Sequence, residues 1–368
     1  MYSNLKKFFS VPNYISMNSS GIEVGNNFVR FVEFTNLKGV VKLSNFGEFP
    51  LAPKTFKDGE IINKEELIKT LYNVKKSLKN DYVKVSVPEE KTYLFNVNLP
   101  YIKPSEIRQA LEFKLEENVP LKLSESIFEF KLIKKPKNER ENLFLNVSVI
   151  PQKTIEDYLE VFNIVGLNVI SFETESKMVS KSLIPRHDNK TSMIVHIKDD
   201  STTMSIVSQG VTCFTSSVPV GNNSVLDSFK RVSGGKYENI KKIPDKILSR
   251  DESYDENVYD SFLNIFSVIK DEMEKFNRYW ESQVALYPDS GFSKLDKVIL
   301  CGRSAAIPGF VNHIIQNIGV DTVIGNVWGN TFNLDGFLPD LEFFDSLDYA
   351  VSIGLAMPSK NNSNIDND

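Results

Sequence analysis

Residues 21–30, Gly21-Ile22-Glu23-Val24-Gly25-Asn26-Asn27-Phe28-Val29-Arg30, carry the pattern on which the prediction of the fold depends. Apolar residues alternate with polar ones on both sides of Gly25-Asn26-Asn27, which is typical of a β-hairpin with a tight turn. Glycine readily adopts positive φ and asparagine tolerates it, so backbone N–H groups of this turn are expected to form a nest for an anion such as a phosphate. Glu23 would then lie close enough to hold a hydrated Mg²⁺. The alternative is an ordinary hairpin with an exposed glutamate.

The composition disfavours several classes of protein. A chain of 368 residues is too long for one compact core, so two or more domains are expected. A formal net charge of −5 offers no basic field to a nucleic-acid partner. No apolar run reaches the roughly 18 residues of a membrane span, and the first residues lack the features of a signal peptide. Cys213 and Cys301 lie far apart, which argues against a disulfide framework and favours the cytoplasm. The three histidines share no ligand spacing, so no zinc site is expected.

The opening pattern returns later in the chain. The first hairpin continues into a predicted strand over 40–49, a helix capped by Asn63 and a strand over 82–88. A second three-stranded meander is predicted over 192–218. Two meanders of this kind predict an internal duplication at the scale of a domain. Between them, strands and two helices over 92–165 predict a compact inserted α+β module.

A glycine near the C-terminal end separates a predicted strand from a helix. The buried strand from Lys297 ends at Gly302, and a helix over 311–318 follows. This arrangement is a common place for a nucleotide base or ribose. The long predicted helix over 261–283 has an apolar stripe that we interpret as core packing.

Two βββαβα halves with a phosphate-type turn in each resemble the actin-like ATPase superfamily. Within it, the chain is similar to the PilM family of type IV pilus assembly proteins, over residues 15–357. The segments that carry the resemblance are Gly21–Gly25, Glu106–Pro120, Ser201–Thr203, Glu272–Phe276 and Cys301–Gly309. The helix that ends at Pro120 and the run Ala306-Ile307-Pro308-Gly309 discriminate best.

The resemblance implies an α/β fold of the actin-like (RNase H-like) type, with duplicated βββαβα halves and an inserted α+β module of the 1C/SHS2-like kind. The implied parts are a flexible leader at 1–13, a first half at 14–88, the inserted module at 89–170, a return helix at 171–190, a second half at 191–357 with a small subdomain at about 225–260, and a disordered tail at 358–368.

The resemblance also implies a site for ATP and Mg²⁺ between the halves. The residues assigned to the nucleotide are Gly21, Glu23, Gly25, Asn26, Asn27, Ser201, Thr202, Lys275, Gly302, Arg303 and Ser304, with Glu23 as a weak Mg²⁺ ligand. Glu175 matches the acid that orients the attacking water. The family has Asp at position 23 and Asp-x-Gly in the second phosphate turn, whereas this chain has His196-Ile197-Lys198 there. Histidine is a poor Mg²⁺ partner, and the Lys198 ammonium offers a point charge to a phosphate instead.

The function implied is a cytoplasmic adaptor of type IV pilus, or related secretion, assembly at the inner face of the cytoplasmic membrane. It would bind ATP with little or no turnover, dock the cytoplasmic tail of a PilN-like inner-membrane protein and contact other pilus assembly proteins. Three alternatives stay open: an FtsA-like cell-division protein that polymerises, an ATP-dependent small-molecule kinase of the same superfamily, and a purely structural protein with an empty cleft.

Overall fold

The computed structural model describes residues 19–358 apart from 38–39, 135, 137, 233–255, 308, 333 and 335. The predicted leader, nearly all of the predicted tail and most of the predicted subdomain at 225–260 lie outside the described residues. Within the described part of the chain, no helix is both long enough and apolar enough to cross a membrane.

The first half is a five-stranded sheet in the order β10-β6-β1-β2-β3. β1 pairs antiparallel with β2 and parallel with β6, and β10 runs parallel to β6. One face is covered by α1 and α3, whose apolar stripes share a core with β1 and β6. The bounds are β1 Ser20–Val24, β2 Phe28–Leu37, β3 Val40–Pro50, α1 Lys64–Ser77, β6 Tyr82–Val87, α3 Gln152–Val165 and β10 Asn168–Thr174, with a short pair β4 Phe56–Lys57 and β5 Glu60–Ile61.

The second half repeats the same topology in the order β13-β12-β11-β14-β15. β11 again pairs antiparallel with the next strand and parallel with β14, as β1 does with β2 and β6. This repetition confirms the internal duplication predicted from the two meanders. The bounds are β11 Ser192–Ile197, β12 Thr202–Ser208, β13 Val211–Val218, α5 Asn222–Val232, α7 Glu256–Leu286, β14 Lys297–Cys301, α8 Phe310–Ile318 and β15 Asp321–Ile324, followed by α9 Phe343–Ser346 and α10 Ala350–Ala356.

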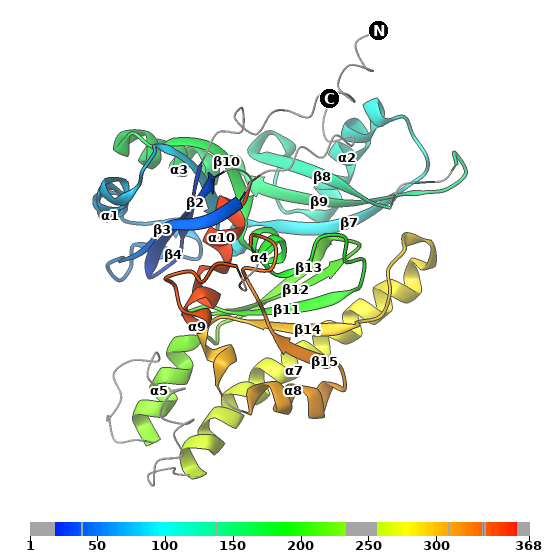
Figure 1. Cartoon of the computed structure of the whole chain (residues 1–368). Helices are drawn as coiled ribbons and strands as arrows, with labels where there is room; N and C mark the ends of the chain where they lie inside the picture. The colour runs from blue at the N-terminus through cyan, green and yellow to red at the C-terminus, as the bar shows by residue number, and fades with distance from the viewer. Residues whose placement is uncertain are drawn as a thin grey trace.

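Two helices lie between the two sheets and connect the halves. α4, Glu175–Leu183, packs through Met178 and Val179 in one core with Ile194 and Val207 of the second half. α10 belongs by sequence to the second half, yet it contacts β1, β2 and β6 of the first (Figure 1). Gly21 lies at this contact: a Cβ there would come within 3.0 Å of backbone atoms of Ser352 and Ala356. Gly21 therefore serves helix packing, because only glycine permits so close an approach.

The inserted module is a three-stranded sheet in the order β7-β9-β8 with one helix. Its own core is built around Leu111 of α2 and Leu145 of β9. Ile133 and Phe144, however, belong to the core of the second half, so the module is packed onto that half although it is inserted into the first. The bounds are β7 Tyr93–Leu99, α2 Pro104–Asn118, β8 Ser126–Lys134 and β9 Leu143–Pro151.

α3 and β10 pack with the first half, whereas the predicted boundaries of the inserted module, 89–170, placed α3 in the module. The range contains all of α3 and the first three residues of β10, but β10 pairs with β6 and α3 contributes Tyr158, Val161 and Phe162 to the core of the first half. The amphipathic pattern of α3 shows that the helix buries one face. It does not show which sheet that face meets, and this is why the sequence placed the helix in the module.

Candidate functional site

The turns that end β1 and β11 meet between the two halves, as the sequence predicted. Asn27 Nδ2 donates to Asp200 Oδ2 at 2.7 Å, and Asn223 Nδ2 donates to Asp200 Oδ1 at 2.7 Å. A cavity of about 40 Å³ lies between the turns. Its walls, called the cleft residues below, are Glu23, Val24, Gly25, Asn26, Asn27, Arg30, Pro88, Glu90, Glu175, Lys198, Asp199, Asp200 and Ser201. Such a volume has room for a few water molecules, whereas a nucleotide needs several hundred Å³.

The first turn does not have the conformation predicted from its glycine and asparagines. None of Gly25, Asn26 and Asn27 has positive φ. Val24 N donates to Ser86 Oγ at 3.2 Å, and Gly25 N donates to Phe28 O at 2.9 Å. These two amides are therefore already engaged by the protein, so neither is free to bind an anion.

Glu23 is buried in β1 and lines the cavity. Its Oε1 lies 4.0 Å from Arg30 Nη1, and its Oε2 has no hydrogen-bond partner among the described residues. Burial raises the pKa of Glu23 to about 8, although the charge of Arg30 opposes the shift. A carboxyl group that stays protonated at neutral pH is a poor ligand for Mg²⁺. Among the described residues, no group of three His, Cys, Asp or Glu side chains is placed to hold a metal ion.

Arg30 contacts both halves through its guanidinium. Arg30 Nε donates to Glu48 Oε2 at 2.7 Å within the first half, and Nη2 lies 3.7 Å from Asp199 Oδ2 of the second. The guanidinium also lies 5.9 Å from the ring centre of Tyr349. Arg30 is thus held from several sides in a poorly solvated position, where ion pairs are strong.

Lys198 lies against carboxylates. Its Nζ is 2.8 Å from Glu175 Oε2 and 3.7 Å from Glu90 Oε1. Burial raises the pKa of Glu175 to about 7, although the charge of Lys198 opposes the shift. Burial alone would lower the pKa of Lys198, but Glu175 and Glu90 raise it above its ordinary value. In this structure the ammonium thus neutralises the acid that the resemblance assigned to the attacking water. Burial also lowers the pKa of His196 to about 3, so its imidazole is neutral.

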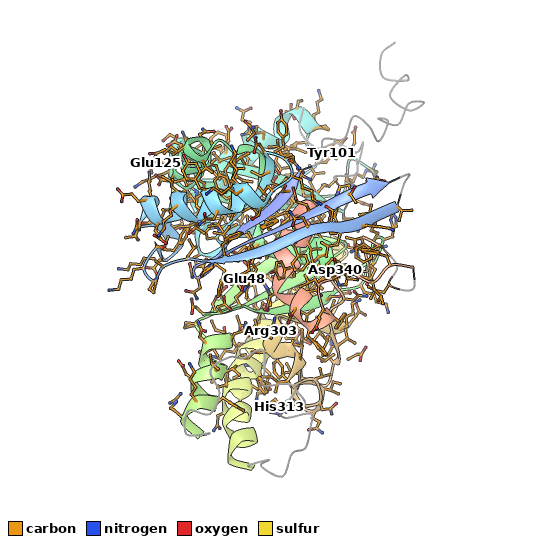
Figure 2. The ribbon with its side chains drawn as sticks, turned by 60° about the vertical axis from the view of Figure 1, so that its left-hand side comes forward. Glu48, Tyr101, Glu125, Arg303, His313 and Asp340 are labelled. Carbon is orange, nitrogen blue, oxygen red and sulfur yellow. The ribbon has the colours of Figure 1, made fainter. Side chains whose placement is uncertain are left out.

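The residues predicted on the adenosine side do not line the cavity. Gly302 has φ 94° and packs on the backbone of Ile197, where a Cβ would collide. Arg303, labelled in the second half in Figure 2, is buried and donates from N and Nε to Asp348. Ser304 Oγ donates to Asn222 Oδ1 at 2.6 Å. Lys275 is largely exposed and pairs with Glu272 on the same helix.

Of the residues predicted for the nucleotide, the cavity collects Glu23, Gly25, Asn26, Asn27 and Ser201, together with Glu175. Gly21 lies beneath α10, and Thr202 Oγ1 donates to Val220 O within the second half. The sequence missed Arg30, Glu90, Asp199 and Asp200 as members of the site. Arg30 could have been found, because it stands opposite Glu48 across β2 and β3 as a cross-strand ion pair. Glu90 follows β6 in a short 3₁₀ turn, and no pattern in the sequence predicts that it lies in the site.

Two sheets of identical topology, with their turns facing one cleft and two helices packed between them, define a protein of the actin-like class. The family model described as type IV pilus assembly protein PilM matches residues 21–360, and the chain belongs to this family. It is similar to the structure described as the PilM-PilN type IV pilus biogenesis complex, with a TM-score of 0.75 and 15% identity over 93% of this chain and 98% of that one. It is also similar to MreB5 of Spiroplasma citri bound to ADP, with a TM-score of 0.51 and 14% identity over 91% and 94% of the two chains.

Proposed function

We propose that this chain is an adaptor of type IV pilus assembly at the cytoplasmic face of the inner membrane, and that its cleft binds Mg-ATP weakly with little or no turnover. The observation that carries the proposal is the pairing of Lys198 with Glu175 at 2.8 Å. Phosphoryl transfer needs a bound metal, a placed water and free positive charge at the same time. In this cleft the carboxylate of Glu175 and the ammonium of Lys198 pair with each other, so neither is free for a water or a phosphate.

The remaining polar groups support the same conclusion. Glu23 is the candidate for the metal, but burial keeps its carboxyl largely protonated at neutral pH. His196, which stands where the family has an aspartate, is neutral and buried. A nucleotide that entered the cleft would have to separate Arg30 from Asp199 and Lys198 from Glu175, so its affinity would be low.

The partner is a PilN-like inner-membrane protein, whose cytoplasmic tail docks at the junction of the first half and the inserted module. β10 and β8 are edge strands of their respective sheets. Lys177 spans the junction, with its Nζ 2.7 Å from Glu129 of β8 and 2.9 Å from Glu173 of β10. Edge strands can accept an extended peptide as an added strand, which suits a short tail. The solved structure with a TM-score of 0.75 to this chain is a PilM-PilN complex, which supports a partner of this kind.

Three measurements on the full chain test this proposal. The first is phosphate release with Mg-ATP, with and without the tail peptide of a PilN-like protein encoded nearby: no release above background is expected. Turnover that disappears in Glu175→Ala would refute the proposal. The second is a binding titration with the same peptide and a scrambled control. Equal affinity for both peptides, or none for either, would count against the adaptor role. A rise in melting temperature with Mg-ATP would separate a weak binder from a protein with a cleft that stays empty.

A further inference from the structure

We infer that the two halves are held together across the cleft by the protein's own side chains, so that closure of the cleft requires no bound nucleotide. We call the contacts concerned the interlobe latch: Lys198 with Glu175 and Glu90, Arg30 with Asp199, and Asn27 with Asp200. The inference concerns the chain by itself and holds whether or not ATP binds weakly.

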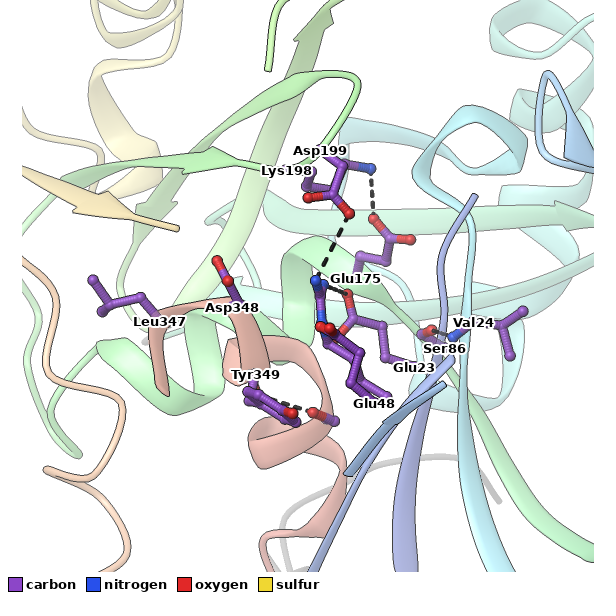
Figure 3. Close-up of polar contacts among 12 residues, drawn as sticks. Glu23, Val24, Glu48, Ser86, Glu175, Lys198, Asp199, Leu347, Asp348 and Tyr349 are labelled. Atoms are coloured by element: carbon purple, nitrogen blue, oxygen red, sulfur yellow. Dashed lines mark hydrogen bonds and ion pairs between the residues drawn. The ribbon is translucent and has the colours of Figure 1, made fainter. Parts of the chain in front are cut away.

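The latch joins elements that are far apart in sequence. Asn27 lies in the turn after β1 and Arg30 lies in β2, while their partners Asp200 and Asp199 follow β11, in the other half. Lys198 also follows β11, and it contacts Glu175, which begins α4 (Figure 3), and Glu90, which follows β6. The contacts therefore run both ways: the first half contributes a cation to the second, and the second contributes a cation to the first. Opening the cleft would break both ion pairs.

Burial makes the loss of one partner of these ion pairs costly. The side chains of Lys198 and Glu175 are 18% and 6% exposed, and that of Arg30 is 12% exposed. Ion pairs in such positions are weakly screened by salt, and removing one partner leaves an uncompensated buried charge. Asp200 is exposed, so its hydrogen bonds to Asn27 and Asn223 contribute less.

The charge of the cleft residues argues against an anion as the group that closes the cleft. Five of them are acids, Glu23, Glu90, Glu175, Asp199 and Asp200, whereas two are cations, Arg30 and Lys198. Even with Glu23 protonated, the acids outnumber the cations. A triphosphate would meet net repulsion, and both cations already contact carboxylates of the chain.

The test is hydrogen exchange of the full chain, followed at the turn over 198–201 and at the turn over 24–28. Wild-type protein is expected to show slow exchange at both turns without nucleotide, and Mg-ATP at millimolar concentration is expected not to slow it further. Lys198→Ala is expected to raise exchange at both turns by about tenfold or more. The matched control is Lys177→Ala, which removes a lysine that also contacts two glutamates but lies outside the cleft.

A second variant keeps the test decisive if Lys198→Ala does not fold. Asp200→Ala removes an exposed side chain that accepts hydrogen bonds from Asn27 and Asn223, so the fold is expected to survive. A rise of about threefold at both turns is expected, since exposed contacts are weaker. The inference is overturned if both folded variants exchange like wild type. It is equally overturned if wild-type turns exchange rapidly alone and become slow with Mg-ATP.

Discussion

The segment Gly21-Ile22-Glu23-Val24-Gly25 contains two glycines that the sequence assigned to phosphate binding. The substitutions Gly21→Ala and Gly25→Ala test whether Gly21 is needed for helix packing instead. A Cβ at Gly21 would lie 2.5 Å from Ala356 N and 2.7 Å from Leu355 Cβ, and closer still to Ser352 O. Because these atoms all belong to α10 and two are backbone, no side chain can rotate away to make room. Ordinary carbon contacts lie at about 3.5–4.0 Å, so the helix would have to shift by roughly 1 Å from the sheet.

The expected cost of Gly21→Ala is about 3 kcal/mol or more, at the upper end of what overpacking costs in a well-packed core. Gly25→Ala is the control, because its Cβ would meet only Phe28 O, at 3.3 Å, and Gly25 does not have positive φ. A cost below about 1 kcal/mol is expected there. Urea denaturation of the full-length variants measures both. The reasoning fails if Gly21→Ala unfolds within about 0.5 kcal/mol of wild type, or if Gly25→Ala is the more damaging of the two.

Three further predictions concern pH, catalysis and the inserted module. Since folding raises the pKa of Glu23 from 4.5 to about 8, the native state binds more protons than the unfolded one in this range, and stability should fall by on the order of 3 kcal/mol from pH 5 to pH 8. Glu23→Gln should remove most of that slope in urea titrations at the two pH values, and an unchanged slope would contradict the assignment. Glu175→Gln should leave phosphate release at background, as in wild type, and a difference between the two would show turnover. Phe144→Ala, which removes a buried ring 5.9 Å from the Tyr287 ring, should cost about 3–5 kcal/mol and loosen the module from the second half in limited proteolysis. Phe113→Ala, at a 73% exposed position of the same module, should stay within about 0.5 kcal/mol of wild type.

The strands of both halves could be predicted from the sequence because their alternation is bounded by turn residues. The strands over 192–197 and 211–218 have the predicted bounds, and the duplication followed from them. The sequence predicts a helix over 154–165, where the structure has one over 152–165, but it does not predict the attachment of this helix to the first half. Tyr158 and Phe162 indicate that the helix buries one face, but they do not indicate which surface covers that face. Packing partners depend on the whole fold, and local periodicity carries no information about them.

The convergence of the turns after β1 and β11 could also be predicted, whereas the contacts that their side chains make could not. Lys198 was identified as the departure from the family pattern, and a phosphate was considered as its counter-charge. The structure gives it Glu175 and Glu90 instead. These acids lie more than 20 and more than 100 positions away in the sequence, and no periodicity links them to Lys198. Arg303 was likewise expected to face a nucleotide, but Asp345 and Asp348 of the late loop and helix segment hold it.

The position of α10 has a consequence for how the protein is made on the ribosome. The strands β1, β2 and β6 are synthesised well before the helix that covers one face of them. Until Ala350–Ala356 has left the exit tunnel, Val32 and the surface around Gly21 lack their cover. The first sheet therefore keeps apolar surface open to solvent until α10 has been synthesised, and a chaperone that shields this surface would raise the yield of native protein.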